Sequence, residues 1–205
     1  MTILSVNKTR DFGWVQYALI FCGWVRLRPF FFWKHPMTRS RYLAHGALIA
    51  ALYAVLTHTQ NLLIPDSASF AVQFRVSEAL CVLAFFTPAA IPGLTLGCLL
   101  FNLTFAGALP LDFLVGSLAT LLAAAGMYLT RKWTLKGYPL FGMLLPALTN
   151  ALLVGWELSV YIGGGLWLNA LYVAIGEAAV LLTLGSALFY AMKLRKLDTR
   201  LFPQT

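Results

Sequence analysis

The sequence is poor in charged residues, and acidic residues are especially scarce. Charged residues make up 11% of the 205 residues and only seven are Asp or Glu, whereas hydrophobic residues make up 60%. Soluble domains carry roughly 25% charged residues, so this balance excludes an ordinary soluble fold. At about 20 apolar residues per membrane span, the length predicts about six spans and no separate soluble domain.

Several functional motifs are also missing. The sequence has no Gly-x-x-x-x-Gly-Lys-Ser/Thr phosphate loop, no Gly-x-Ser-x-Gly and no His-Glu-x-x-His, so neither ATP hydrolysis nor another enzymatic activity is expected of this chain. Its three cysteines are widely spaced and it has three histidines. This pattern predicts neither a disulfide framework nor a metal site, and no cofactor is expected.

The apolar runs predict an all-α membrane protein with spans at about 43–63, 70–87, 90–106, 111–129, 138–158 and 166–192. The net charge of +8 comes mostly from Lys and Arg beside these runs, which indicates topology and not nucleic-acid binding. Basic residues accumulate in cytoplasmic connections. The expected fold is therefore a six-transmembrane-helix bundle with both termini cytoplasmic, because basic residues occupy alternate connections: Arg39 and Arg41; Arg131, Lys132 and Lys136; Lys193, Arg195, Lys196 and Arg200.

Residues 1–36 form an N-terminal extension of uncertain role, and residues 37–205 form the membrane domain. The extension holds a 14-residue apolar run, Phe12 to Val25, which is short for a span. An interfacial helix, a signal-like segment without a cleavage site and a misassigned start ahead of Met37 all remain open.

Two opposite charges, Arg75 and Glu78, lie in the apolar segment 70–80. A spacing of three residues places them on one helix face. Charges inside a membrane are costly and usually mark a functional path, although a purely structural ion pair is the alternative. With the predicted orientation, Asn102, Asp112 and Glu157 also fall in the outer half of the bundle, with Glu177 deeper. The sequence therefore predicts a polar site open to the outside.

The side chains in this region suit a planar polar ligand. Carboxylates accept hydrogen bonds from ring N–H and amine donors, and aromatic rings stack on a planar face. Asn150 and Glu157, seven residues apart, lie on nearly the same helix face. Trp167 and Tyr172 are candidates for stacking, with residues of a membrane-interface belt as the alternative.

Small residues recur at helical spacing in the first predicted span: Gly46, Ala47, Ala50, Ala51 and Ala54. Such stripes allow close helix contacts, either within the bundle or with a partner protein. Gly93 and Gly97 form a second small pair, which predicts tight packing of the third span.

From residue 37 to about 200 the chain resembles the QueT family, the substrate-binding S components of energy-coupling factor (ECF) transporters that take up queuosine precursors. The resemblance rests on Gln-Phe-Arg-Val-Ser-Glu-Ala-Leu at 73–80, Pro-Gly-Leu-Thr-Leu-Gly-Cys at 92–98, Gly-Ser-Leu-Ala-Thr-Leu at 116–121, Pro-Ala-Leu-Thr-Asn-Ala at 146–151 and Ile-Gly-Glu at 175–177.

The resemblance implies a prokaryotic cell-membrane protein that captures 7-aminomethyl- or 7-cyano-7-deazaguanine from outside. A transmembrane coupling (T) subunit, docked on the small-residue stripe, and two ABC ATPase subunits would supply the energy. Glu78, Glu157 and Glu177 are then candidates to bind the guanine-like edge or a ligand ammonium, with Arg75 orienting Glu78 and Asn150 offering an amide.

Three other functions remain open. The chain could be a solitary secondary transporter with Glu177 as the ion-coupling carboxylate, an S component for a vitamin, or a membrane scaffold in which Arg75 and Glu78 are purely structural.

Overall fold

A computed structural model describes residues 38–65, 67 and 74–202 of the chain. The predicted extension 1–36 lies outside the described residues. The described part belongs to one compact unit, Pro36–Thr205, and it contains helices and connections without a β-strand. The predicted all-α fold is confirmed.

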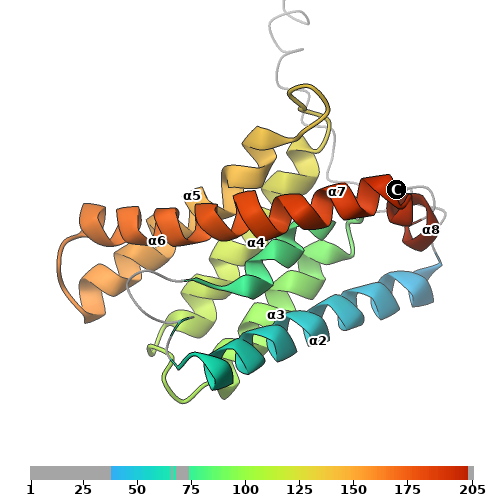
Figure 1. Ribbon diagram of the computed structural model, residues 1–205. Coiled ribbons are helices and arrows are strands. Elements are labelled where there is room, and N and C mark those ends of the chain that lie inside the picture. The colour runs from blue at the N-terminus through green and yellow to red at the C-terminus, as the bar shows by residue number, and fades with distance from the viewer. Residues whose placement is uncertain (1–37, 66, 68–73, 203–205) are drawn as a thin grey trace, which may run out of the picture. The chain divides into compact units, whose positions relative to one another are not determined.

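Helices of unequal length follow one another along the chain (Figure 1). In order they are α2 (Arg39–Leu63), the 3₁₀-helix η2 (Val76–Phe85), α3 (Ala90–Thr104), α4 (Asp112–Thr130), α5 (Leu140–Tyr161), α6 (Leu166–Val180), the π-helical turn η3 (Leu181–Gly185), α7 (Ser186–Leu194) and α8 (Leu197–Leu201).

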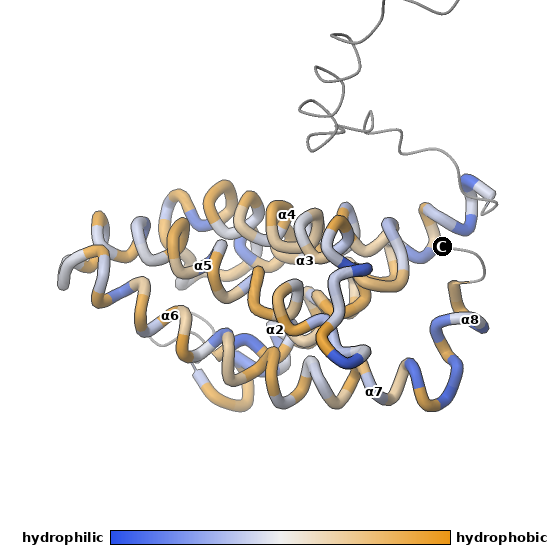
Figure 2. The backbone as a smooth tube through the Cα atoms, turned by 90° about the horizontal axis from the view of Figure 1, so that it is seen from above, coloured by the Kyte–Doolittle hydropathy of each residue, from blue (hydrophilic) through white to orange (hydrophobic). Residues whose placement is uncertain are grey.

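Four of the described helices are long and apolar enough to cross a membrane: α2, α4, α5 and the continuous rod of α6, η3 and α7 over Leu166–Leu194. Figure 2 shows hydrophobic residues along most of their length. The ten-residue η2 and fifteen-residue α3 are shorter; at about 2.0 and 1.5 Å per residue they extend roughly 20 and 22 Å, against a hydrocarbon thickness of about 30 Å. Helix length thus supports four spans and does not confirm the predicted six.

The second predicted span differs most from expectation. Among the described residues of this span, regular helix begins at Val76, after Phe74 and Arg75 in extended chain, and it is 3₁₀ instead of α. Gln60 of α2 holds the start of this helix: its Oε1 accepts from the Val76 N–H at 2.7 Å, and its Nε2 donates to the Phe74 carbonyl and to Ser67 Oγ at 2.9 Å. The Phe74 carbonyl and the Val76 N–H therefore both pair with one side chain.

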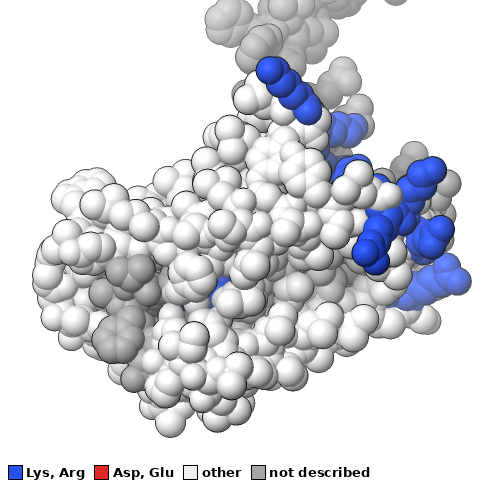
Figure 3. All heavy atoms as spheres, in the orientation of Figure 1, with Lys and Arg blue, Asp and Glu red and all other residues white. Residues whose placement is uncertain are grey.

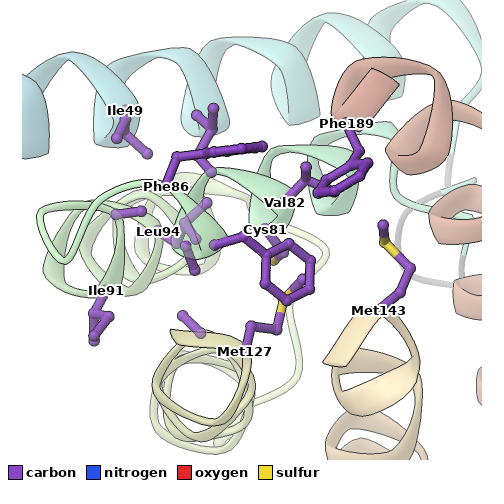
Figure 4. Packing of buried hydrophobic residues seen from close by; sticks show 14 of the residues in the cluster. Ile49, Cys81, Val82, Phe86, Ile91, Leu94, Met127, Met143 and Phe189 are labelled. Atoms are coloured by element: carbon purple, nitrogen blue, oxygen red, sulfur yellow. The ribbon is translucent and has the colours of Figure 1, made fainter. Parts of the chain in front are cut away.

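η2 lies at the centre of the described unit. It packs against α2, α3, α4, α5, α6, α7 and η3, and eight of its ten residues are buried. Figure 4 shows Cys81 and Val82 of η2 among apolar side chains from the surrounding helices. The main hydrophobic core is thus built around this short helix, with contributions from Ile49, Leu94, Met127, Met143 and Phe189.

α2 and α3 pack closely because both present small residues at their contact. A Cβ atom added to Gly93 would lie 2.7 Å from the Gly46 carbonyl oxygen, and one added to Gly97 would lie 2.8 Å from the Ala50 carbonyl oxygen and 2.7 Å from Tyr53 Cβ. The predicted tight packing at Gly93 and Gly97 is confirmed. Gly46 and Ala50 are the partners of this pair.

The exposed basic side chains gather at one end of the unit, where α2 begins, where α4 connects to α5 and where α7 leads into α8 (Figure 3). At this end Lys193 Nζ lies 3.2 Å from Asp198 Oδ2. An exposed pair of this kind contributes little stability. The concentration of Lys and Arg at one end is typical of a cytoplasmic face.

Replacing Gly97 with alanine is expected to lower the free energy of unfolding by about 1–3 kcal/mol, because the new methyl group meets backbone that cannot move away easily. Gly46→Ala is the matched control, since its Cβ would lie 3.4 Å from the nearest atom, the Ala89 carbonyl oxygen. Thermal unfolding in detergent would measure both variants. Equal melting temperatures would contradict the close contact at Gly97.

Candidate functional site

One arginine and four carboxylic residues are the buried charged residues of the described chain: Arg75, Glu78, Asp112, Glu157 and Glu177. Their exposed fractions run from 0 to 4%. Arg75 precedes η2, Glu78 lies in it, and the other three lie in α4, α5 and α6. Arg75 interacts electrostatically with all four acidic residues. We call these five residues the charged cluster.

Glu78 is held by two hydrogen bonds. The Tyr53 hydroxyl of α2 donates to Oε1, and the Cys81 thiol donates to Oε2 at 3.0 Å. A 3₁₀-helix has three residues per turn, so residues 78 and 81 lie in line along η2. The predicted orienting of Glu78 by Arg75 stays a prediction, whereas Tyr53 and Cys81 hold both carboxylate oxygens in the structure.

Arg75 lies between the carboxylates and an aromatic ring. Its guanidinium carbon is 5.8 Å from the centre of the Phe101 ring, which is 1% exposed, and the Glu78 N–H donates to the Arg75 carbonyl at 3.1 Å. A cation at this distance from a ring face is attracted by its quadrupole. Arg75 is therefore fixed at the start of η2 beside the buried acids.

Glu177 and Asn150 meet across the contact between α6 and α5. Asn150 Nδ2 donates to Glu177 Oε1 at 2.7 Å, while Glu177 Oε2 has no hydrogen-bond partner among the described residues. Further along the same helix pair, Gly155 lets α5 and α6 approach closely, because a Cβ atom there would lie 2.7 Å from Ala170 Cα. Glu177 thus keeps one oxygen for a further donor.

Glu157 has the least satisfied side chain of the charged cluster. It is fully buried, and neither oxygen has a hydrogen-bond partner among the residues the structure describes. Asp112 and Arg75 interact with it electrostatically. Nearby, Asn102 Nδ2 donates to the Asp112 carbonyl at 2.8 Å, while Asn102 Oδ1 has no partner in the described chain.

Several buried acceptor atoms in and beside the charged cluster have no hydrogen-bond partner in the described chain. They require an explanation, because buried polar groups are normally hydrogen-bonded. The atoms concerned are Glu157 Oε1 and Oε2, Glu177 Oε2 and Asn102 Oδ1. No group of three or more His, Cys, Asp or Glu in the described ranges is placed to hold a metal ion. The arrangement can accept several N–H donors from an organic ligand.

The predicted aromatic residues do not join this cluster. Trp167 is 79% exposed and Tyr172 is 37% exposed, both on the outer side of α6. The buried aromatic residues in contact with the charges are Tyr53 and Phe101, neither of which was predicted from the sequence. A signal for Tyr53 was present, because it continues the buried stripe of Gly46, Ala50 and Thr57 at helical spacing.

The small-residue stripe of α2 divides between two faces. Gly46 and Ala50 are buried against α3, Ala54 is partly buried, and Ala47 and Ala51 are exposed. Only Ala47 and Ala51 therefore lie fully on the outer side of the bundle. The predicted docking of a partner on this side stays a prediction.

Tyr53→Phe is expected to lower the free energy of unfolding by about 1–3 kcal/mol, because a buried carboxylate loses a hydrogen-bond donor. Tyr161→Phe is the control, since Tyr161 is 41% exposed. Chemical or thermal unfolding in detergent would measure the difference. Equal stability of the two variants would show that Tyr53 does not hold Glu78.

Comparison with known proteins agrees with this architecture. The model of the QueT transporter family matches residues 43–194. The "Queuosine precursor transporter QueT" of Lactococcus lactis subsp. cremoris (strain MG1363) is 42% identical over 76 residues, which are 37% of this chain and 42% of that protein, so the match spans less than half of the relative.

No solved structure matches the chain. The family match covers more than half of the sequence and most of the described helices. Together with the long apolar helices, it identifies a multi-pass integral membrane protein. The chain belongs to the QueT transporter family.

Proposed function

We propose that this chain is the S component of an ECF-type importer and captures a queuosine precursor from outside the cell. The ligand is a 7-deazaguanine with a 7-aminomethyl or 7-cyano group. Membership of the QueT transporter family and the name of the Lactococcus relative support this class of ligand. The observation that carries the proposal is the set of buried, unpaired acceptors at Glu157 and Glu177.

The chemistry of a guanine-like ring fits these acceptors. Its edge presents ring N–H and exocyclic amine donors, which pair with carboxylate oxygens. Glu177 Oε2 is open for such a donor while Asn150 holds Oε1. Glu78 already receives two hydrogen bonds, so its role is to fix η2 and the electrostatics of the site.

Six membrane crossings with both termini in the cytoplasm remain the proposed topology. The two short helices, η2 and α3, would complete the count beside the four long ones. Their packing against longer helices supports this, because η2 contacts α2, α4, α5 and α6, and α3 contacts α2 and α4. The basic end of the unit would then be the cytoplasmic end.

The energy for uptake would come from partner proteins, a T subunit and two ABC ATPase subunits. The absence of a phosphate loop from the sequence agrees with this division of labour. Ala47 and Ala51 offer a shallow, exposed strip on α2 against which another helix can approach closely.

Binding of 7-aminomethyl-7-deazaguanine should raise the melting temperature of the purified chain. At a hundredfold excess over Kd, the ligand adds about 2.7 kcal/mol to the free energy of unfolding. Glu177→Gln should weaken binding by about tenfold or more, because an amide offers a poorer acceptor to a buried donor. Guanine and thiamine are the comparison ligands. No shift with either deazaguanine, from a folded preparation, would reject the ligand class.

Ala47→Leu with Ala51→Leu should reduce uptake several-fold in cells that contain the T subunit and ATPases, and should leave ligand binding by the isolated chain unchanged. Leu52→Trp is the control, because Leu52 is exposed on another side of the same helix. Full uptake by the double variant would remove this surface from the proposal. Gradient-driven uptake by the chain alone would favour a secondary transporter.

A further inference from the structure

The charged cluster contains more negative than positive charge. Its single guanidinium, Arg75, is accompanied by four acidic residues. The described chain has only five acidic residues, and Asp198 is the one outside this cluster. With all groups ionised, the cluster would carry three uncompensated negative charges inside the membrane domain. Such an excess requires cations or protons, because isolated buried charges are strongly unfavourable.

The four acidic residues differ in what already stabilises them. Glu78 receives hydrogen bonds from Tyr53 and Cys81, and Glu177 receives one from Asn150. No donor in the described chain reaches either Glu157 oxygen, and its electrostatic neighbours are Asp112, of the same sign, and Arg75, of the opposite sign. Glu157 of α5 is therefore the acid of the cluster that the described chain stabilises least, because Asp112 of α4 opposes the favourable effect of Arg75.

We propose that Glu157, beside Asp112, binds a cationic substituent of the ligand and so determines a preference for amine-bearing over neutral ligands. This inference rests on the proposed function. An alkylammonium group brings one positive charge and three N–H donors, which match unpaired carboxylate oxygens. A metal ion is a poorer match, since no described group of three His, Cys, Asp or Glu could hold one.

A nitrile in the same place would have the opposite effect. It carries no charge and no N–H donor, so it would leave both Glu157 oxygens buried without a partner. A site built to hydrogen-bond one group rejects an analogue that lacks it, because its own buried groups then remain unpaired. Glu157 thus distinguishes the 7-aminomethyl from the 7-cyano ligand, while Glu177 contacts the ring that both share.

The test compares Kd values of the full chain in detergent for 7-aminomethyl- and 7-cyano-7-deazaguanine. The unmodified chain should bind the amine about tenfold or more tightly than the nitrile. Glu157→Gln should weaken binding of the 7-aminomethyl ligand and leave binding of the 7-cyano ligand unchanged, so that most of the preference is lost. Glu157→Asp keeps the charge and should keep the preference. Asp198→Asn, at the basic end, should change neither affinity.

Two results would overturn the inference while leaving the proposed function intact. One is equal affinity of the unmodified chain for amine and nitrile, as expected of a protonated Glu157 that needs no cation. The other is an equal loss of both affinities in Glu157→Gln. If that variant does not fold, Asp112→Asn must reduce the same preference, or the inference fails. If the unmodified chain binds neither ligand, both the proposed function and this inference are overturned.

Discussion

The hydrogen bond from Tyr53 to Glu78 is the contact on which the centre of this protein depends. It ties α2 to η2, and η2 in turn packs against each of the helices from α3 to α7. The same carboxylate accepts a hydrogen bond from the Cys81 thiol, so Glu78 is bonded both to α2 and to a residue of η2 itself. Because Arg75 directly precedes η2, the position of this helix also places the cation relative to the three other acids.

Close backbone contacts at small residues bring the polar side chains together. Gly97 allows α3 to approach α2 beside Tyr53, and Gly155 allows α5 to approach α6 at Ala170, on the helix pair that also carries Asn150 and Glu177. In a membrane, helix association depends on such packing and on interhelical hydrogen bonds, because lipid is as apolar as the helix surfaces. Close packing and buried polar contacts therefore occur between the same pairs of helices.

The sequence predicted which charged residues are buried better than it predicted how they are arranged. Scarce charges in apolar segments pointed correctly to Arg75, Glu78, Glu157 and Glu177 as buried, because the cost of burying charge makes each such residue informative. Aromatic residues carry no such signal, which is why exposed Trp167 was selected and buried Tyr53 was not. The apolar run predicted a helix at 70–87, but it could not predict that the described part is a 3₁₀-helix starting at Val76, because hydrophobicity does not distinguish the two helix types.

The amide side chain of Gln60 takes the place of a neighbouring peptide group for the chain ahead of η2. One end accepts from the Val76 N–H and the other donates to the Phe74 carbonyl, as the backbone of a paired strand would. Within a membrane domain each of these groups needs a partner. A carboxylate would provide only the acceptor and an apolar side chain neither, so the backbone at 74–76 restricts residue 60 to side chains that both donate and accept.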